Sequence, residues 1–196
     1  MSEQSKRNNK RLMSKERTVG ITLWSYTKYQ LWRYLSALKY IQKTDTVVDI
    51  GAGCGYGSYI LSQKASKVIS VDDSKEAVDF ANSYFDNNNI ERLNRDILTI
   101  EQQFDVVVAY EILEHFKDDD MFFQKLASMT KKYLILTVPD TSSKIGAHHW
   151  RHYTPERIEE LYKNNGFDVE ELRQVLHKPH RKVSGIFAVG SRQGDE

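Results

Sequence analysis

T-V-V-D-I-G-A-G-C-G-Y-G, residues 46–57, is the stretch on which the prediction of the fold rests. Val47, Val48 and Ile50 form a short apolar run with β-branched side chains, which predicts a buried strand. Glycines follow at every second position from residue 51 to residue 57. They let the backbone turn sharply and approach a ligand more closely than a Cβ would permit. A strand that leads through such a loop into a helix is typical of the nucleotide-binding edge of an α/β sheet.

The spacing of these glycines indicates which kind of nucleotide cofactor the loop binds. A dinucleotide fingerprint has its third glycine two residues after Cys54, but that position is Tyr56, and Gly55 comes one residue early. The spacing argues against a pyrophosphate cofactor and for a smaller one, S-adenosylmethionine. A glycine loop by itself also fits a tight structural turn, so this alternative stays open until other parts of the chain agree.

The composition of the chain limits the number of domains, the partners and the compartment that we expect. The chain has 196 residues, 40% of them hydrophobic, which suffices for the core of one domain with a modest extension. The net charge of +1 indicates no global field that would attract nucleic acid or a membrane surface. The single cysteine, Cys54, excludes an intramolecular disulfide and fits a reducing compartment. Because no apolar run approaches the ~20 residues of a membrane span and no signal-peptide core is present, we expect a cytoplasmic protein.

Two segments precede the first strand. Residues 1–17 are basic and have almost nothing to bury, so we expect a disordered arm. Contact between this arm and nucleic acid is an alternative that we do not favour. Residues 18–45 are expected to form a helical cap, because the aromatic and apolar side chains between Trp24 and Ile41 are spaced mostly for one helix face. This face either docks on the core or covers the cofactor. Residues 46–196 are expected to form the main α/β domain.

A second strand is expected over residues 67–71, and it ends at two acidic residues, Asp72 and Asp73. They come about 20 residues after the first glycine, where a carboxylate can accept hydrogen bonds from both ribose hydroxyls. Asp73 precedes Glu76 by three residues, which is the spacing of a capping box for a helix over 74–85. Both are candidates for the cofactor site, and Asp72 is the preferred ribose ligand.

The next two strands deliver further polar residues. A strand over 91–95 ends at Asp96 and Ile97, whose carboxylate and amide are candidates to bind an adenine ring. The run F-D-V-V-V-A, residues 104–109, is nearly continuous in apolar side chains, as is typical of a central parallel strand. Its carboxyl end brings Y-E-I-L-E-H, residues 110–115, to the ligand edge of the sheet.

Taken together, these motifs resemble the class I S-adenosylmethionine-dependent methyltransferases whose fourth strand ends in E-x-x-E-H. The chain is similar to the methyltransferases often associated with bacterial glycan assembly, from about residue 16 to residue 190. The resemblance implies a doubly wound, Rossmann-like α/β fold: a seven-stranded sheet with an antiparallel last strand and helices on both faces. The residues that it places at the cofactor are Asp49, Gly51, Gly53 and Gly55 at the methionine end, Asp72 at the ribose, and Asp96 with Ile97 at the adenine. Tyr110 joins them as a cofactor-side candidate.

The chain departs from this family before the fifth strand. The usual Leu-Lys-Pro-Gly-Gly turn is absent, and M-T-K-K, residues 129–132, leads directly into Y-L-I-L-T-V-P. Pro139 is expected to end that strand, and a polar loop follows over 140–150. Thr154 and Pro155 predict the N-cap and first residue of a helix that ends before Asn165-Gly166. Two closing strands are expected over 167–176 and 183–191, joined by a basic loop over 177–182.

Four residues are candidates for the chemistry of methyl transfer. Alignment supplies much of the acceleration in an in-line displacement, and a base helps when the acceptor is a hydroxyl. Glu111, directly after the fourth strand, is expected to bind the cofactor or to orient the acceptor. His115, His148 and His149 are the candidate bases. Each histidine has the alternative of a capping, bracing or surface role.

The same signature supports a second hypothesis, a divalent metal. If Glu111, Glu114 and His115 lie on one helical face, then together with His148 or His149 they form a set of oxygen and nitrogen ligands. This arrangement resembles the metal-dependent RNA 3′-terminal 2′-O-methyltransferases. E-x-x-E-H also occurs widely in metal-free relatives, so our assignment contains no metal.

We therefore expect an enzyme that transfers a methyl group from S-adenosylmethionine to a hydroxyl or amine of a small molecule or glycan. The metal-dependent RNA methyltransferase is the first alternative. A catalytically silent domain that binds S-adenosylmethionine is the second. Acceptor identity and oligomeric state are not predicted.

Overall fold

The computed structural model describes residues 19–142, 148–178 and 183–194. The predicted basic arm over 1–17 lies outside the described residues, as does most of the basic loop predicted over 177–182. Among the described ranges there is no helix with the length and apolar character of a membrane span.

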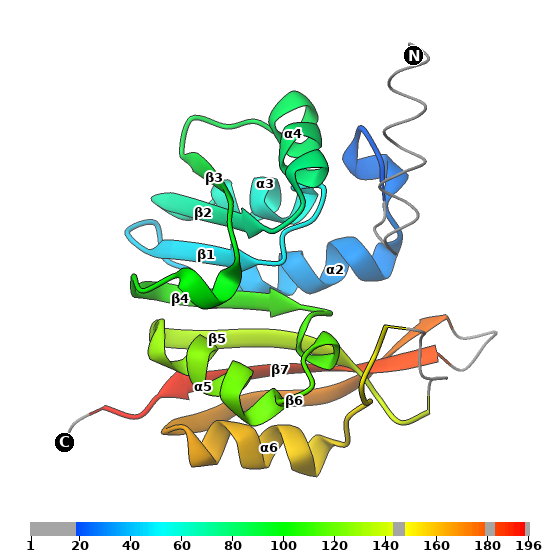
Figure 1. The fold of residues 1–196 in the computed structure, drawn as a ribbon, viewed down its shortest axis with the longest axis vertical. Coiled ribbons are helices and arrows are strands. Elements are labelled where there is room, and N and C mark those ends of the chain that lie inside the picture. Colours follow the sequence, from blue (N-terminus) through cyan, green and yellow to red (C-terminus); the bar gives the residue numbers. More distant parts are fainter. Residues whose placement is uncertain (1–18, 143–147, 179–182, 195–196) are drawn as a thin grey trace. The chain divides into compact units, whose positions relative to one another are not determined.

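The seven strands of the sheet follow the order β3 (Ile90–Asn94), β2 (Lys67–Asp72), β1 (Thr46–Ile50), β4 (Phe104–Tyr110), β5 (Thr130–Pro139), β7 (Val183–Arg192) and β6 (Phe167–Lys178) (Figure 1). Strand β2 runs parallel to β1 and β3, and β4 runs parallel to β5. Strand β7 is antiparallel to both β5 and β6. The predicted seven-stranded Rossmann-like sheet with an antiparallel last strand is confirmed.

The chain divides into two compact units, of which the first ends at Thr99 and the second begins at Ile100. Elements of the first unit alternate between helix and parallel strand. They are η1 (Leu23–Ser25), α2 (Lys28–Ala37), η2 (Leu38–Tyr40), β1 (Thr46–Ile50), α3 (Tyr56–Ser62), β2 (Lys67–Asp72), α4 (Lys75–Tyr84), β3 (Ile90–Asn94) and η3 (Ile97–Thr99), where η denotes a 3₁₀ turn. The second unit contains β4 (Phe104–Tyr110), η4 (Leu113–His115), α5 (Asp119–Ser128), β5 (Thr130–Pro139), α6 (Pro155–Asn164), β6 (Phe167–Lys178) and β7 (Val183–Arg192).

Burial explains why the apolar run at 46–50 forms a strand. Val47 and Val48 are fully buried and Ile50 is 1% exposed. Burying each such side chain contributes about 1.5–3 kcal/mol to folding. The glycine loop then begins directly after Ile50, so the strand fixes where the loop starts.

Helix α2 replaces the longer aromatic helix expected between Trp24 and Ile41. Thr27 caps it through a capping box with Gln30, so the helix begins at Lys28 and leaves Trp24 and Tyr26 before it. The Tyr26 hydroxyl donates to the carbonyl of Gly20 over 2.9 Å, and its ring stacks on Tyr56 at 3.8 Å between centroids. Tyr26 is therefore held by a hydrogen bond and by ring packing and not by the helix, whereas Trp24 is 96% exposed.

Two predicted helix starts in the first unit are corrected. Asp73 is not the N-cap of α4, because Ser74 holds that position and its side chain accepts from the Ala77 N–H. The sequence after the glycine loop predicts a helix over 58–65, but α3 begins at Tyr56, because Gly55 takes the left-handed conformation (φ 83°) and acts as the N-cap.

The predicted end of β5 at Pro139 and both ends of α6 are confirmed, while β5 begins earlier than expected, within residues 129–132. Met129 caps the end of α5 and β5 begins at Thr130, whose hydroxyl donates to the Leu126 carbonyl over 2.8 Å. This hydrogen bond joins the end of α5 to the start of β5, where the usual Leu-Lys-Pro-Gly-Gly turn is absent. Helix α6 begins at Pro155 behind the N-cap Thr154, and left-handed Gly166 (φ 76°) follows it, as predicted.

Candidate functional site

The glycine loop contains three left-handed glycines, Gly51 (φ 69°), Gly53 (φ 55°) and Gly55 (φ 83°). A Cβ added at Gly53 would meet no atom within 4 Å, whereas one at Gly55 would lie 2.4 Å from the Cβ of Ala81. Gly55 is therefore required where the loop packs against α4. Gly53 leaves open space at the turn, as a loop that approaches a ligand needs.

Asp72 closes this loop from the end of β2. One of its carboxylate oxygens accepts from the Gly53 N–H over 2.8 Å, and the other accepts from the Ser74 N–H over 2.9 Å. Its side chain is buried, while that of Asp73 is exposed. Both carboxylate oxygens thus hold the loop, and a contact of Asp72 with ribose hydroxyls stays a prediction. This geometry favours Asp72 over Asp73 and gives Asp72 a loop-shaping role that the sequence did not predict.

Asp49 lies at the other side of the loop and is fully buried. The hydroxyl of Ser58 donates to it over 2.7 Å and that of Tyr34 over 3.2 Å. Burial raises the pKa of Asp49 to about 6, although both hydrogen bonds and the charge of Arg33 act in the opposite direction. Asp49 is thus mainly ionised at neutral pH and can face a cationic ligand group.

The cap segment contributes residues that the sequence analysis missed. A Cβ at Gly57 would lie 2.0 Å from Cζ of Tyr34, so only glycine admits this ring. Arg33 donates to the Tyr56 hydroxyl over 2.9 Å. The periodicity of residues 24–41 indicated a helix face but could not show which loop residues it meets.

The charged residues around the glycine loop fit the predicted cofactor. The methionine end of S-adenosylmethionine carries an ammonium and a carboxylate, which match the charges of Asp49 and Arg33. The open space at Gly53 and the buried carboxylate of Asp72 suit a ribose. The charges of the residues around the loop and the open space at Gly53 are therefore compatible with bound S-adenosylmethionine.

The predicted adenine residues follow β3. Asp96 is exposed, and its carboxylate accepts from the Leu98 N–H over 2.9 Å, while Ile97 is buried in η3. Asp96 thus shapes its own turn. A contact of either residue with adenine stays a prediction.

The second unit contains the candidates for methyl transfer, which follow β4. Tyr110 is buried, with its ring 6.4 Å from that of Phe187. Glu111 has φ 53°, the one non-glycine residue with positive φ in the described part of the chain, and its N–H donates to the Thr137 carbonyl over 2.9 Å. The predicted helical face of Glu111, Glu114 and His115 is wrong, because the only helical turn here is η4, which starts after Glu111. Left-handed backbone at such a residue costs on the order of 1 kcal/mol or more and is concentrated at functional sites.

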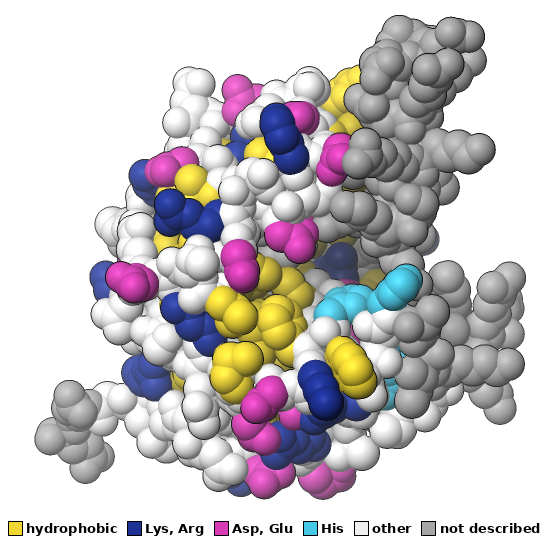
Figure 2. All heavy atoms as spheres, in the orientation of Figure 1, with side chains coloured by type: hydrophobic (Ala, Val, Ile, Leu, Met, Phe, Trp, Pro, Cys, Tyr) yellow, Lys and Arg dark blue, Asp and Glu magenta, His cyan; other side chains and the backbone are white. Residues whose placement is uncertain are grey.

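The loop before α6 nevertheless brings His148 and His149 close to His115. The ring of His149 lies 4.9 Å from that of His115, nearly perpendicular to it. Nδ1 of His115 contacts the carbonyl oxygen of His148 at 3.1 Å, so His148 takes part through its backbone while its side chain is exposed. Glu114 is fully buried, and its carbonyl accepts from the Trp150 N–H over 2.8 Å. Figure 2 shows histidine side chains together at the surface.

One ligand atom each from Glu114, His115 and His149 lie within 4.8 Å of one another. This set differs from the predicted one, because it contains Glu114 and not Glu111. Nδ1 of His149 in turn lies 3.0 Å from Nε2 of His152, a residue that the sequence analysis did not select. The residues of this cluster have the chemistry of a general base, of a proton pathway or of a set of metal ligands.

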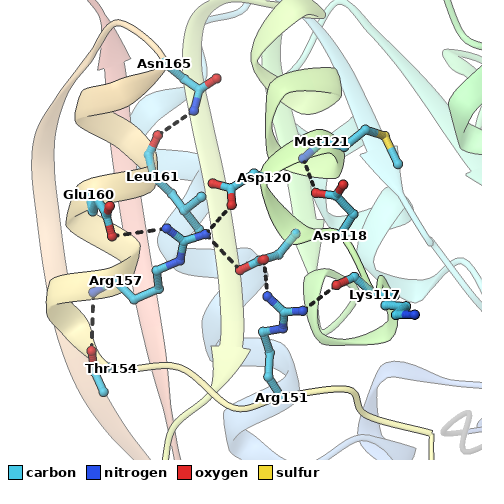
Figure 3. A network of polar contacts seen from close by, with 11 residues as sticks. Lys117, Asp118, Asp120, Met121, Arg151, Thr154, Arg157, Glu160, Leu161 and Asn165 are labelled. Atoms are coloured by element: carbon cyan, nitrogen blue, oxygen red, sulfur yellow. Dashed lines mark hydrogen bonds and ion pairs between the residues drawn. The ribbon is translucent and has the colours of Figure 1, made fainter.

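A network of charges holds the loop in place (Figure 3). Asp119 opens α5 with its side chain 3% exposed, and it pairs with Arg151 of the loop and with Arg157 of α6. Arg151 also donates to the Lys117 carbonyl. Because a buried carboxylate needs such partners, Asp119 ties the loop at Arg151, directly before His152, to α5.

Two buried hydroxyls lie in the same unit, those of Thr137 and Tyr153. Within the described ranges neither has a hydrogen-bond partner. Burial raises the pKa of Tyr153, and the charges of Asp119 and Glu114 act in the same direction. Buried hydroxyls normally find a partner, so water or a ligand would be expected to satisfy them.

Two curated relatives of this chain are ubiquinone biosynthesis O-methyltransferases. Ubiquinone biosynthesis O-methyltransferase of Dictyostelium discoideum, a mitochondrial protein, is 27% identical, and the match covers 68% of this chain and 53% of the relative. The corresponding protein of Bradyrhizobium diazoefficiens is 25% identical, with 68% and 62% covered. The chain therefore spans between half and two thirds of the length of these relatives.

Solved structures show the same fold. Magnesium protoporphyrin IX methyltransferase of Synechocystis PCC 6803, in a structure with bound SAH, has a TM-score of 0.75 and 16% identity, with 97% of this chain and 95% of the other covered. Residues 41–178 match the family described as methyltransferase domain. Since this match covers more than half of the chain, the chain belongs to the methyltransferase domain family and has the class I, S-adenosylmethionine-dependent fold.

Proposed function

We propose that this chain transfers a methyl group from S-adenosylmethionine to a hydroxyl group of a small molecule. The observation that carries the choice of a hydroxyl is the cluster of Glu114, His115, His149 and His152. A hydroxyl acceptor loses a proton during transfer, and a base must receive it. The printed names of the curated relatives, O-methyltransferases of ubiquinone biosynthesis, agree with an oxygen acceptor.

S-adenosylmethionine is the cofactor of this family, as the sequence predicted, and it supplies a methyl group on a positively charged sulfur. In our proposal Gly53 and Asp72 hold its ribose, while Asp49 and Arg33 face its amino acid end. The contacts that support this assignment are the Gly53 hydrogen bond to Asp72 and the two hydroxyl donors to Asp49. Asp96 and Ile97 stay the candidates for the adenine.

We propose that residues 18–45 serve as a cap on the glycine loop. The hydrogen bond from Tyr34 to Asp49 and the stacking of Tyr26 on Tyr56 support this role. The cytoplasm is the proposed compartment, since Cys54 is buried and unbridged.

On the acceptor side, Glu111 orients the acceptor and His149 receives its proton, with His115 as the neighbouring alternative. The strained backbone of Glu111 sets the direction of its side chain, because its N–H is tied to Thr137 of β5. Alignment of this kind accounts for a large part of the acceleration in a displacement reaction. His148 stays a weaker candidate, since its contact in the cluster is made by its carbonyl.

The test is transfer of a radiolabelled methyl group from S-adenosylmethionine to a panel of phenols and catechols, sugars and sugar nucleotides, and small amines. We expect label on at least one hydroxyl compound and a lower turnover number in Glu111→Gln. Label on amines alone would contradict the hydroxyl assignment. Binding of S-adenosylhomocysteine without transfer to any acceptor would favour the non-catalytic alternative. Label on a sugar would restore the predicted glycan acceptor.

A metal-dependent enzyme is the second candidate function. The ligand atoms of Glu114, His115 and His149 within 4.8 Å favour it, since imidazole and carboxylate are common ligands of divalent metals. Two adjacent hydroxyls, as at the 3′ end of RNA, are acceptors of suitable chemistry. If this candidate is right, chelator abolishes transfer to such an acceptor and Mg²⁺ or Mn²⁺ restores it. In our first proposal turnover is insensitive to chelator.

A further inference from the structure

Trp150 is a large aromatic side chain that lies at the surface of the second unit. Its side chain is 59% exposed, although the backbone on both sides is held in place. The Trp150 N–H donates to the Glu114 carbonyl over 2.8 Å, and Arg151 binds Asp119 and the Lys117 carbonyl (Figure 3). A single exposed apolar side chain is common on protein surfaces, so the neighbours of Trp150 decide whether it has a role.

Lys117 supplies a positive charge beside this ring. Its ammonium nitrogen lies 5.7 Å from the centre of the Trp150 ring, within the range of a cation–π interaction. The side chain of Lys117 is exposed, and throughout the described part of the chain no carboxylate pairs with its ammonium group. An exposed ring and an exposed cation are thus presented together, and the cation is left to pair with an anionic group of a ligand.

The ring and the cation lie beside the candidate bases. Residues 114–117 and 148–151 run side by side, because three contacts join them: from Nδ1 of His115 to the His148 carbonyl, from the Trp150 N–H to the Glu114 carbonyl, and from Arg151 to the Lys117 carbonyl. His149, whose ring lies 4.9 Å from that of His115, directly precedes Trp150. A molecule that contacts Trp150 and Lys117 therefore lies next to the histidines that the proposed function places at the acceptor.

We propose that Trp150 and Lys117 select the methyl acceptor, and that this acceptor is an aromatic hydroxyl compound with one acidic group. The inference rests on the proposed function. The aromatic ring of the acceptor packs against the exposed indole, and its acidic group pairs with the ammonium of Lys117. Because the backbone of Trp150 is already held in place, little freedom is lost there on binding. In this scheme neither residue contacts the transferred methyl group, so both determine specificity.

The charges of this surface favour an aromatic acid over a sugar nucleotide. One ammonium group balances one carboxylate, whereas the diphosphate of a sugar nucleotide carries at least two negative charges. Arg151 of the same loop is already paired with buried Asp119. A neutral sugar would leave the charge of Lys117 unused.

The first part of the test measures binding and needs no methyl transfer. Protein labelled with fluorotryptophan is titrated with protocatechuate, caffeate and salicylate in the presence of S-adenosylhomocysteine, and the tryptophan signals are followed by ¹⁹F NMR. Trp150→Phe assigns the signal of Trp150. We expect at least one acid to shift this signal, and its uncharged amide to bind about threefold more weakly or worse. A Trp150 signal that none of the three acids moves would overturn the proposal.

Variants separate the charge from the ring. Lys117→Gln is expected to weaken binding of the acid by about threefold or more and to leave binding of the amide unchanged. Lys131→Gln is the matched control, because Lys131 is an exposed lysine at the start of β5, the end of the strand away from Thr137. Trp150→Leu is expected to weaken binding of acid and amide alike, whereas Trp150→Phe retains a ring and most of the affinity. Equal effects of Lys117→Gln and Lys131→Gln would overturn the role of the charge, and unchanged affinity in Trp150→Leu would overturn that of the ring.

The second part measures transfer of the methyl group. We expect an aromatic acid among the acceptors, and Trp150→Leu and Lys117→Gln to raise its KM by about threefold or more with little change in kcat, because the lost contacts bind substrate and transition state alike. Transfer to sugars or sugar nucleotides with the same KM in both variants would overturn the inference and leave the proposed function standing. Binding of aromatic acids at Trp150 without transfer to any hydroxyl compound would support the aromatic-acid site and contradict the proposed function.

Discussion

The hydroxyl of Tyr34 donates a hydrogen bond to Oδ1 of Asp49 over 3.2 Å and joins α2 to β1. The same tyrosine ring occupies the space that a side chain at residue 57 would fill. One residue of the cap thus meets both the buried carboxylate before the glycine loop and the helix after it. A substitution in the cap, in the glycine loop or at Asp49 is therefore expected to disturb the packing of the other two.

Stability is expected to depend on the titration of Asp49. Burial raises its pKa from 3.8 to about 6, so between these pH values the native state binds more protons than the unfolded state. The contribution of Asp49 is therefore fully present below pH 3.8 and is lost as the pH rises through 6, by roughly 3 kcal/mol. In Asp49→Asn this loss is absent. Urea unfolding of both proteins at pH 4.5 and pH 7 measures the difference, and parallel pH dependence of the two proteins would contradict the assignment.

A methyl group at residue 57 is expected to displace Tyr34. The added Cβ of Gly57→Ala lies 2.0 Å from the tyrosine ring, and overpacking of this kind costs about 1–3 kcal/mol. In a Tyr34→Ala background the same change is expected to cost much less, because the clashing ring is gone. A double-mutant cycle by urea unfolding measures the coupling. Additive effects of the two substitutions would show that residue 57 and Tyr34 do not compete for space.

Binding of S-adenosylhomocysteine is expected to depend on Asp72 and little on Asp73. Asp72→Ala removes charge-assisted hydrogen bonds to the ribose and releases the Gly53 N–H, and we expect binding to weaken by about 2 kcal/mol or more. Asp73 is exposed and makes the matched control at the next position. Calorimetry gives both affinities, with thermal unfolding as the check on folding. Equal affinity of Asp72→Ala and the unaltered protein would mean that another group binds the ribose.

Removal of the buried carboxylate at residue 119 is expected to be strongly destabilising. Asp119→Ala removes the carboxylate that pairs with Arg151 and with Arg157, and each hydrogen bond to a charged group is worth about 1.5–3 kcal/mol. Asp120→Ala removes an exposed partner of Arg157 and is expected to cost about 1 kcal/mol or less. Urea unfolding compares the two variants. Similar values for both would show that burial of Asp119 does not strengthen its ion pairs.

Local signals predicted the elements that local chemistry controls. Thr154, Pro155 and Gly166 placed both ends of α6, because an N-cap, a proline and a left-handed glycine act within a few residues of themselves. The E-x-x-E-H signature misled for the opposite reason. Its spacing suggests one helical face, but the Glu111 N–H bonds to Thr137 of β5, and the backbone there turns left-handed.

The sequence by itself determined the strand and glycine loop at 46–57 and the acidic residue at the end of β2, since periodicity and glycine spacing are properties of neighbouring residues. Only the tertiary structure decided which residues surround the loop and the histidine cluster. Arg33 and Tyr34 reach the loop from a separate helix, and His149 reaches Glu114 and His115 from a loop more than 30 residues further along the chain. No local pattern encodes such contacts, because they depend on how buried surfaces pack.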